Sequence, residues 1–407
     1  MPLATRRSAS QRVMGTSPVE VGRAEFCEYV ENWFAANAPR KGSPDDFSAI
    51  HTISGNSISE YRDAEHHALE VSLSWQKRLY AAGLSGRWWP VDYGGQGAPE
   101  WQDEEIARVQ SGYGVSTKVL AVGLEMLPPV LFAHGSHEQR LRYLPPVLRG
   151  EETWCQLLSE PDAGSDLGSA KSFAAPVPGG WSVSGQKVWT SGGGTSDFAL
   201  LIARTDKEIS GMAGLSCFLL DMASQGVEVR PLRQMSGAYH FNEVFLEDVF
   251  VPTEGLVGEL GSARPILRTM LAGERAAIGG GTSARASQQL VQLAVRLGRH
   301  REPLVRQELA SALTRERVLN LTQERIAAGG VVCAGGSVVK LLYSEHARRC
   351  ANTGSWLLGP PATAEVAHED NEWRDRLLFG PGLRIGGGTD EIQRNAIAER
   401  GLMLPRS

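Results

Sequence analysis

The sequence predicts an α+β protein of three units: an N-terminal helical domain, a middle antiparallel β-barrel and a C-terminal four-helix bundle. Apolar residues recur at helical spacing up to about residue 150 and again from about residue 261. Between these regions lie short β-rich segments separated by glycine and proline, a pattern typical of a small antiparallel barrel or sandwich. We therefore divide the chain into a disordered basic tail, the helical domain, the β-domain and the bundle, at residues 1–19, 20–150, 151–260 and 261–407.

In the first domain, helical periodicity predicts a series of helices. They cover residues 20–37, 65–83, 101–113, 117–134 and 138–149. Pro128 and Pro129 should bend or break the fourth of these, because proline lacks the N–H that the interior of an α-helix uses. Residues 38–64 are polar and contain glycine and proline, so we expect an exposed, loosely ordered connection.

The boundaries of the middle and last domains are predicted from changes in the spacing of apolar residues, from a helical to a strand pattern and back. Strands are expected at residues 154–159, 181–190, 198–204, 215–221, 227–231 and 243–246. Long helical segments with short joins follow, at residues 263–297, 303–329, 337–354 and 390–401. Such segments favour an antiparallel helix bundle.

Composition argues against several functional classes. The 407 residues are 42% hydrophobic and 21% charged, as in a soluble globular protein. The net charge of -5 gives no reason to expect nucleic acid or an anionic membrane as a partner, and no segment is long and apolar enough to span a bilayer. The five cysteines are scattered, and the nine histidines show no metal-ligand spacing. We therefore predict a cytoplasmic protein without a metal site.

Glu274 is the residue that periodicity singles out for chemistry. Leu267, Leu271, Glu274 and Ile278 share one face of a predicted helix, so this carboxylate belongs to an apolar stripe. Burial raises the pKa of a carboxylate, which suits a general base for a weakly acidic C–H. The alternative is a carboxylate that pairs with an arginine of another helix, and periodicity leaves both interpretations open.

Three segments combine small residues with the ends of predicted strands or helices. Residues 156–168 form an apolar run that ends in a loop with Gly164 and Ser165, where backbone N–H groups can approach a flat, phosphate-bearing cofactor. Residues 185–191 end a strand with a tryptophan, which in isolation is expected to be a core residue. Residues 388–394 begin a helix whose free N–H groups suit a pyrophosphate.

In this order the three segments resemble the signatures of the acyl-CoA dehydrogenase family, flavoenzymes that desaturate acyl thioesters beside the carbonyl. The resemblance covers nearly the whole chain and implies bound FAD. In that case Trp189 would cover one face of the isoalloxazine ring, and Thr190 or, as the closer match, Ser191 would bond the ring near N5. The implied FAD contacts are Gln156, Leu157, Leu158, Ser159, Gly164, Ser165, Trp189, Thr190, Ser191, Arg296, Thr389 and Glu391.

The resemblance also implies which residue is the catalytic base. Most members carry it within the run that is residues 385–389 here, where the matching position is Gly387 and offers no side chain. A minority, including isovaleryl-type members and a bacterial branch, carry it on the first helix of the bundle, where Glu274 matches. Arg275 then matches an arginine at the mouth of the substrate pocket. The expected substrate contacts are Ser165, Arg275 and Gly387, and the space left at Gly387 favours a branched or bulky acyl group.

Two departures from the family pattern concern how FAD is shared between subunits. Residues 362–379 lack the glutamine- and glycine-rich loop that often reaches a neighbouring subunit's flavin. Arg296, the nearest candidate for the arginine that reaches across the dimer, lies one place off the commoner register. Both departures resemble the bacterial branch, which includes members with unequal subunits.

The implied reaction is FAD-dependent α,β-dehydrogenation of an acyl-CoA thioester to the trans-2-enoyl thioester, within fatty acid or lipid metabolism. Electrons would pass to an electron-transfer flavoprotein. Two alternatives remain open: a flavin oxidase or monooxygenase on the same fold, and a subunit of a heteromeric acyl-CoA dehydrogenase. We expect a homodimer or homotetramer, with a heterotetramer as the alternative.

Overall fold

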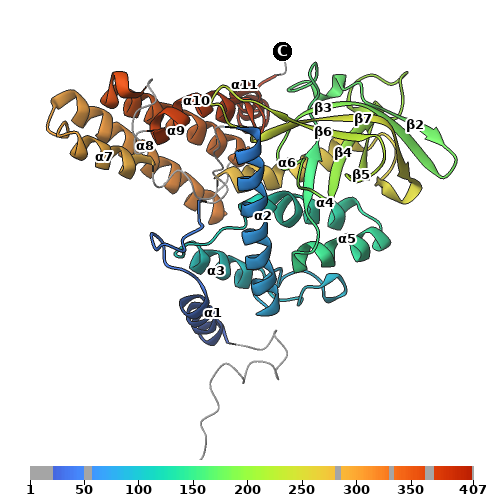
Figure 1. Ribbon diagram of the computed structural model, residues 1–407, viewed down its shortest axis with the longest axis horizontal. Coiled ribbons are helices and arrows are strands. Elements are labelled where there is room, and N and C mark those ends of the chain that lie inside the picture. The colour runs from blue at the N-terminus through green and yellow to red at the C-terminus, as the bar shows by residue number, and fades with distance from the viewer. Residues whose placement is uncertain (1–21, 50–56, 280–285, 330–333, 363–370, 406–407) are drawn as a thin grey trace, which may run out of the picture.

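The computed structural model describes residues 22–49, 57–279, 286–329, 334–362 and 371–405 (Figure 1). Within these ranges, the side chains of 272–279, 327 and 371 are outside the description. Helix α2 (Ile58–Ala81) stands between a helical bundle on one side and the β-domain on the other (Figure 1). The fold class predicted from the sequence, helices followed by a sheet and then a helical bundle, is confirmed.

The N-terminal domain consists of helices before the first strand. Besides α2 they are α1 (Arg23–Asn37), η3 (Val91–Tyr93), α3 (Trp101–Gln110), η4 (Lys118–Leu120), η5 (Val122–Met126), α4 (Leu127–His134) and α5 (His137–Arg149). The prediction that the second helix begins at residue 65 was wrong. It begins at Ile58 because the Ser57 side chain caps it by accepting a hydrogen bond from the Glu60 N–H at 3.2 Å. The predicted tail and residues 50–56 of the predicted connection lie outside the described residues.

The interruption predicted at Pro128 and Pro129 is confirmed. The segment divides into the 3-10 turn η4, the π-helix η5 and the short helix α4, which has proline in its first turn. In η5 the N–H of Leu127 bonds to the carbonyl of Val122, five residues earlier. The two prolines cannot donate to the preceding turn, so the helix widens at this point.

The middle domain is one mixed sheet. Its strands are β1 (Trp154–Leu157), β2 (Phe173–Val177), β3 (Gly180–Thr190), β4 (Phe198–Arg204), β5 (Leu215–Asp221), β6 (Val227–Leu232), β7 (Phe241–Pro252) and β8 (Leu256–Val257). On β4, Leu200 and Ile202 pack against helices α4 and α6 (Ala263–Gly279), whereas Leu201 and Ala203 pack among the strands. This period of two places both faces of the strand in a core.

The sheet departs from the prediction in its pairing. Its order is β6-β7-β3-β2-β4-β5-β8, and β1 lies beside β4. Most pairs are antiparallel as predicted, but β1 pairs with β4 in parallel, as β2 does at one position. Parallel neighbours need a long connection, which residues 158–197 supply between β1 and β4. Among the described strands β6 and β8 do not pair with each other, so the sheet is open rather than a closed barrel. The short strands β2 and β8 were not predicted.

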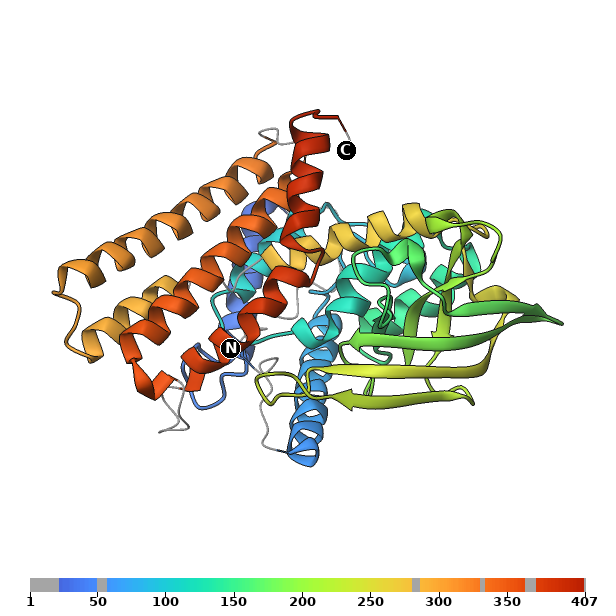
Figure 2. The same ribbon diagram turned by 90° about the horizontal axis from the view of Figure 1, so that it is seen from above.

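The C-terminal region is organised around helix α9 (Gly335–Leu358), which packs against every long helix of the bundle. The others are α7 (Ala286–Arg296), α8 (Pro303–Ala327), η10 (Pro360–Ala362), α10 (Asn371–Ile385), α11 (Asp390–Ala396) and the π-turn η11 (Ile397–Gly401). Figure 2 shows α7 to α10 side by side, while α6 extends from them toward the β-domain. Helix α6 is described as far as Gly279 and α7 from Ala286, and the part of the predicted helical segment 263–297 between them lies outside the described residues. Helix α10 was not predicted, because Gly380 and Pro381 have low helix propensity and interrupt its helical pattern.

Close packing of α9 and α10 gives a test of this fold. A Cβ built on Gly354 of α9 would overlap ring atoms of Trp373 on α10, and this indole is buried. Gly354→Ala should lower the free energy of unfolding by about 1–3 kcal/mol, because the ring must shift within a packed interior. Chemical denaturation followed by circular dichroism measures this change.

Gly380→Ala on α10 is the matched control, since a Cβ there meets nothing within 4 Å. It should be neutral or stabilising by up to about 1 kcal/mol, because alanine favours a helix over glycine. Equal losses in the two variants would contradict the packing argument.

Candidate active site

The loop that follows β1 is held by a buried ion pair. Lys187 on β3 is 0% exposed, and its Nζ lies 2.8 Å from Glu160 Oε1 and donates to the Leu158 carbonyl at 3.0 Å. The Glu160 carboxylate also accepts the backbone N–H groups of Lys171 and Ser172, at 2.6 and 3.0 Å. The two ends of the 158–172 loop are therefore attached to one carboxylate and one strand.

The charges of this pair stabilise each other. Burial by itself raises the pKa of Glu160, but the ammonium of Lys187 and the donors around the carboxylate outweigh burial, and the pKa falls below its usual value. Burial lowers the pKa of Lys187, and Glu160 opposes that shift. Removing either partner would leave an uncompensated charge in the interior.

The end of β3 presents Trp189 to solvent. The register shifts by one residue between Lys187 and Thr190, which oppose Val244 and Asn242 on β7. Trp189 occupies this bulge with φ of 64° and is 56% exposed, and its ring centroid lies 5.7 Å from that of Phe241 in an edge-to-face arrangement. A left-handed conformation costs about 1–2 kcal/mol in an L-residue, and bulges are over-represented next to active sites. The bulge leaves an indole face open to a flat ligand.

Two buried polar atoms near this bulge have no hydrogen-bond partner among the described residues. They are Oε1 of Gln156 on β1 and Oγ1 of Thr190 at the end of β3. The two strands meet where the Val188 N–H donates to the Ser159 carbonyl at 2.9 Å. Orphaned polar atoms in a native interior call for an explanation, and a ligand edge that carries donors and acceptors would satisfy both. The residues present therefore fit a flavin ring.

The remaining residues of the first and second segments lie at the surface of the same region. Gly164 and Ser165 are exposed, and a Cβ on Gly164 would meet nothing within 4 Å. Ser191 is exposed in the turn that follows β3. Leu157 is buried, and Leu158 is partly buried against the helical core. The structure thus brings the predicted residues of the first two segments together.

The third segment forms a glycine loop before α11. Gly387 and Gly388 have φ of 67° and 86°, and Gln393 Nε2 donates to both carbonyls at 2.9 and 3.2 Å. The Thr389 hydroxyl caps α11 by accepting the Ile392 N–H at 3.1 Å. Glu391 is exposed and pairs with Arg394, at 3.3 Å between Oε1 and Nη1.

A second buried carboxylate holds that loop. Asp390 is 1% exposed, and it accepts Lys340 Nζ at 3.0 Å, Ser344 Oγ at 2.7 Å and Arg384 Nε at 2.7 Å. These partners come from α9 and from the end of α10, so the loop between α10 and α11 is fixed from both sides. Burial raises the pKa of Asp390, but the hydrogen bonds of Arg384, Ser344 and Lys340 lower it further than burial raises it.

Helix α6 positions residue 274. Ala263, Ile266, Leu267 and Met270 are buried at spacings of three and four, and position 274 is four residues beyond Met270. The side chains of Glu274 and Arg275 lie outside the described residues. Arg296 is exposed at the end of α7, and Figure 1 shows this helix in the part of the bundle away from the β-domain. Within one chain the structure therefore does not bring Arg296 to the other predicted contacts.

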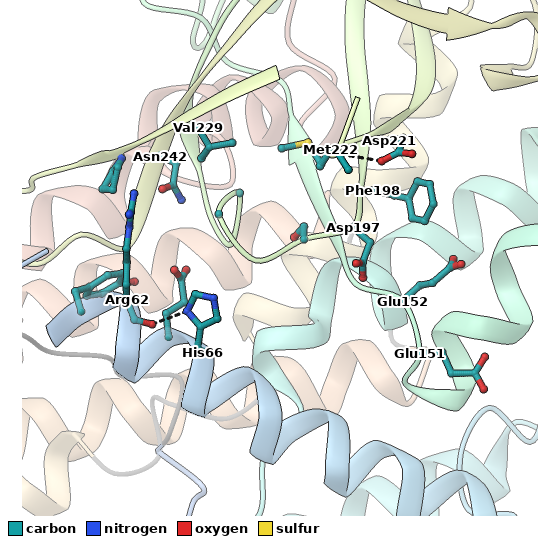
Figure 3. A pocket seen from close by; sticks show the side chains of 17 residues that line it. Arg62, His66, Glu151, Glu152, Asp197, Phe198, Asp221, Met222, Val229 and Asn242 are labelled. Atoms are coloured by element: carbon teal, nitrogen blue, oxygen red, sulfur yellow. Dashed lines mark hydrogen bonds between the residues drawn. The ribbon is translucent and has the colours of Figure 1, made fainter. Parts of the chain in front are cut away.

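A cavity of about 580 Å³ lies beside this region, between α2, the turn after β3 and strands β6 and β7 (Figure 3). None of the predicted cofactor residues lines it. Its lining includes the carboxylates of Glu65, Glu151, Glu152, Asp197 and Asp221, together with Arg62 and His66. This excess of carboxylates disfavours a phosphate-bearing ligand, so we do not assign the cofactor to it. Sequence patterns did not reveal this cavity, because its lining comes from separate elements.

Comparisons with known proteins agree with this architecture. The order of a helical domain, a sheet and a helical bundle is the domain order of the acyl-CoA dehydrogenases. Three sequence models match the chain: acyl-CoA dehydrogenase N-terminal domain at residues 53–151, middle domain at 155–249 and C-terminal domain at 264–402.

The relatives extend over nearly the whole chain. The acyl-CoA dehydrogenase IpdE1 of Mycobacterium tuberculosis (strain ATCC 25618 / H37Rv) is 35% identical over 391 residues, which are 94% of this chain and 98% of the relative. FadE34 of the same organism is 36% identical over 349 residues, which are 81% of this chain and 46% of the relative. The chain belongs to the acyl-CoA dehydrogenase family, and it is an oxidoreductase of a class that implies a flavin.

Solved structures share the fold. The structure titled Tcur3481-Tcur3483 steroid ACAD has a TM-score of 0.75 at 24% identity and covers 94% of this chain and 98% of its own. The ChsE4-ChsE5 complex from Mycobacterium tuberculosis has a TM-score of 0.72 at 23% identity, with coverage of 94% and 98%. In the described part of this chain, no helix is long and apolar enough to cross a membrane. No cluster of His, Cys, Asp or Glu suited to a metal occurs among the residues described.

The buried pair predicts a large effect of a single substitution. Lys187→Met should lower the free energy of unfolding by about 3–5 kcal/mol, because it leaves the Glu160 carboxylate buried without its cation. Lys171→Met is the matched control, since its ammonium makes a 3.0 Å pair with Asp162 in which both side chains are exposed. That variant should lose no more than about 1 kcal/mol. Urea denaturation compares the two, and similar losses would mean that the buried pair has no special role.

The Asp390 cluster predicts a pH dependence. Its folded-state pKa lies below the unfolded value, so its stabilising contribution is present above the unfolded pKa and is lost as the pH falls through the folded pKa. Asp390→Asn should cost about 3 kcal/mol at pH 7, and its difference from the wild type should shrink as the pH falls below about 4. Denaturation curves between neutral and acidic pH test this expectation. A difference that stays constant across that range would contradict it.

Proposed function

We propose that this protein binds FAD and desaturates a bulky acyl-CoA thioester to the trans-2-enoyl thioester. The proposal rests on the side chains that the structure brings together at the end of β3. There the strand that ends in an exposed Trp189 also bears Thr190, and it meets the segment that bears Gln156; one buried polar atom of each of these two residues has no partner among the described residues. An aromatic face and unsatisfied polar atoms are what a flat heteroaromatic ring with a polar edge needs.

In this proposal the chain's own residues hold the cofactor at both ends. Trp189 covers the ring, and Gln156, Ser159, Thr190 and Ser191 border its polar edge. Gly164, Ser165, Thr389 and Glu391 lie toward the phosphates, on the two loops that the Glu160 and Asp390 clusters fix. When bound, FAD supplies a two-electron acceptor for a hydride from the β-carbon. Arg296 is proposed to act across a subunit interface, because it lies away from these residues in its own chain.

Glu274 is proposed as the catalytic base. Its position continues the buried spacing of α6, so a carboxylate there would be poorly hydrated and basic enough to remove the α-proton of a thioester. Confinement between this helix and the β-domain would orient the α C–H and exclude water. Arg275 and Ser165 would bind the polar part of the substrate.

Gly387 supports a bulky acyl group. It has no side chain, and its φ of 67° disfavours any residue with a Cβ. Two structures of the same fold are titled steroid ACAD, and a steroid-derived acyl group is of this bulky class. We propose that electrons pass to an electron-transfer flavoprotein in the cytoplasm. The described cysteines, Cys27, Cys155, Cys217 and Cys350, are free thiols, which supports a reducing compartment.

A second candidate is a subunit of a heteromeric acyl-CoA dehydrogenase. It is supported by the titles of two solved structures of this fold, which each name a pair of proteins. Purification of the chain alone discriminates between the proposals: a preparation without flavin absorbance would favour the heteromeric form. Comparing peroxide release with dye reduction separates a dehydrogenase from an oxidase of the same fold.

Replacement of the proposed base is the decisive test. Glu274→Gln should keep its flavin absorbance and lose at least about 100-fold in turnover, because general-base catalysis contributes about 10²–10⁴-fold. Reduction of an acceptor dye across a panel of straight and bulky acyl-CoA esters measures it, with Glu70→Gln on the exposed face of α2 as the control. Unchanged turnover in Glu274→Gln would place the base elsewhere. A panel in which short straight chains rank first would count against a bulky substrate.

A further inference from the structure

The cavity of about 580 Å³ beside the turn after β3 has no role in the proposed function. Ligand pockets in proteins commonly have volumes of about 300–1,000 Å³, so this cavity has a size that takes a small organic molecule. Part of its wall is apolar, from Phe198, Met222, Val229 and Pro231. The polar part comes from α2, from the segment before β1 and from the ends of strands (Figure 3). An occupant therefore needs both an apolar body and polar groups.

Carboxylates without a cationic partner give the cavity a negative charge. Of the five carboxylates in the lining, two pair with arginines that lie outside it, at 2.6 and 2.7 Å. The other three, Glu65, Asp197 and Asp221, form no ion pair among the described residues. The described residues of the lining include one arginine, Arg62, and no lysine. The excess of negative charge favours a cationic occupant.

Two acceptors of the lining have no donor in the part of the chain that is described. Asn242 on β7 is 4% exposed, and its Nδ2 donates to the Thr190 carbonyl at 3.1 Å. Because a carbonyl only accepts, the amide turns its nitrogen to Thr190 and leaves its Oδ1 without a described donor. The half-buried Glu65 carboxylate likewise accepts no hydrogen bond from a described residue. Acceptors of this kind call for a donor, which a ligand can supply.

The packing of α2 on the start of β7 brings these two acceptors to one cavity. Tyr61 and His240 are in contact, with ring centroids 5.7 Å apart and the Tyr61 Oη 3.4 Å from the His240 Nδ1. Glu65 follows Tyr61 by four residues, so both lie on one face of the helix. Asn242 follows His240 by two residues, and side chains two residues apart point to the same side of a strand. Both acceptors therefore flank this contact and face the cavity that they line.

We propose that this cavity is a binding site for an organic cation, an alkyl guanidinium or alkyl ammonium group whose N–H groups bridge Glu65 and Asn242. A guanidinium has five donors in a plane and an ammonium has three, so either serves a carboxylate and an amide oxygen at once. The alkyl part packs on the apolar wall. The site adjoins the proposed flavin face, because Asn242 also bonds the end of the strand that carries Trp189.

Titration calorimetry of the holoenzyme with butylguanidinium and with butylurea, a neutral molecule of the same shape, tests the inference. The wild type should bind butylguanidinium at least about 10-fold more tightly, because only this ligand carries charge. Glu65→Gln keeps the shape of the side chain and should weaken butylguanidinium about 10-fold while leaving butylurea unchanged. Glu70→Gln makes the same change at an exposed position of α2 and should leave both affinities at the wild-type values.

A second pair of ligands separates a free cation from an arginine side chain of a partner protein. A capped Gly-Arg-Gly peptide carries the guanidinium on a polypeptide, and citrulline in place of arginine gives its neutral counterpart. Tighter binding of the peptide than of butylguanidinium assigns the site to a partner's side chain, and weaker binding assigns it to a free cation. The inference is overturned if the wild type binds the charged and neutral ligands alike or binds neither, or if Glu65→Gln behaves as Glu70→Gln does. Calorimetry needs no turnover, so this outcome is independent of the proposed function.

Discussion

The ion pair between Lys187 and Glu160 is the constraint on which the rest of the site depends. An ammonium and a carboxylate are costly to bury separately, and together they are stable only in a geometry that satisfies the other donors and acceptors around them. Here those groups are the Leu158 carbonyl and the N–H groups at the far end of the loop. The pair therefore fixes the loop after β1 against the strand that carries Trp189. The backbone hydrogen bond from Val188 to the Ser159 carbonyl joins the same two segments, and the buried pair adds a charge-assisted link beside it.

The same device recurs in the bundle. Asp390 accepts hydrogen bonds from side chains of α9 and α10, and Glu160 accepts them from Lys187 on β3 and from the backbone of its own loop. In both cases a buried carboxylate lies next to a glycine-containing loop. Loops of this composition lose much conformational entropy when they are ordered, so attachment by strong, charge-assisted hydrogen bonds compensates for what glycine cannot supply. Two such loops on different domains can then present backbone to one elongated ligand.

The architecture followed from periodicity, whereas the contacts that hold the site did not. The spacing of apolar residues in the long helices, and the apolar runs of strands such as β4 and β5, are visible in the sequence. The order of the domains could therefore be predicted. Strand β2 contains Pro176, and α10 contains Gly380 and Pro381, so their local signals contradict the structure that packing imposes. Lys187 and Glu160 are 27 residues apart in the sequence and obey no spacing rule. The Ser57-x-x-Glu60 cap was visible in the sequence and was missed.

The backbone around residue 387 is less suited to a catalytic carboxylate than helix α6 is. Gly387 has a left-handed φ and its carbonyl accepts Gln393, so a side chain there would strain a loop that is already held at both ends. Helix α6 has no such conflict, because a carboxylate at position 274 occupies an ordinary helical site four residues beyond a buried methionine. If the base lies on α6, as proposed, the α-carbon of the substrate would lie between position 274 and the β-domain rather than beside the glycine loop.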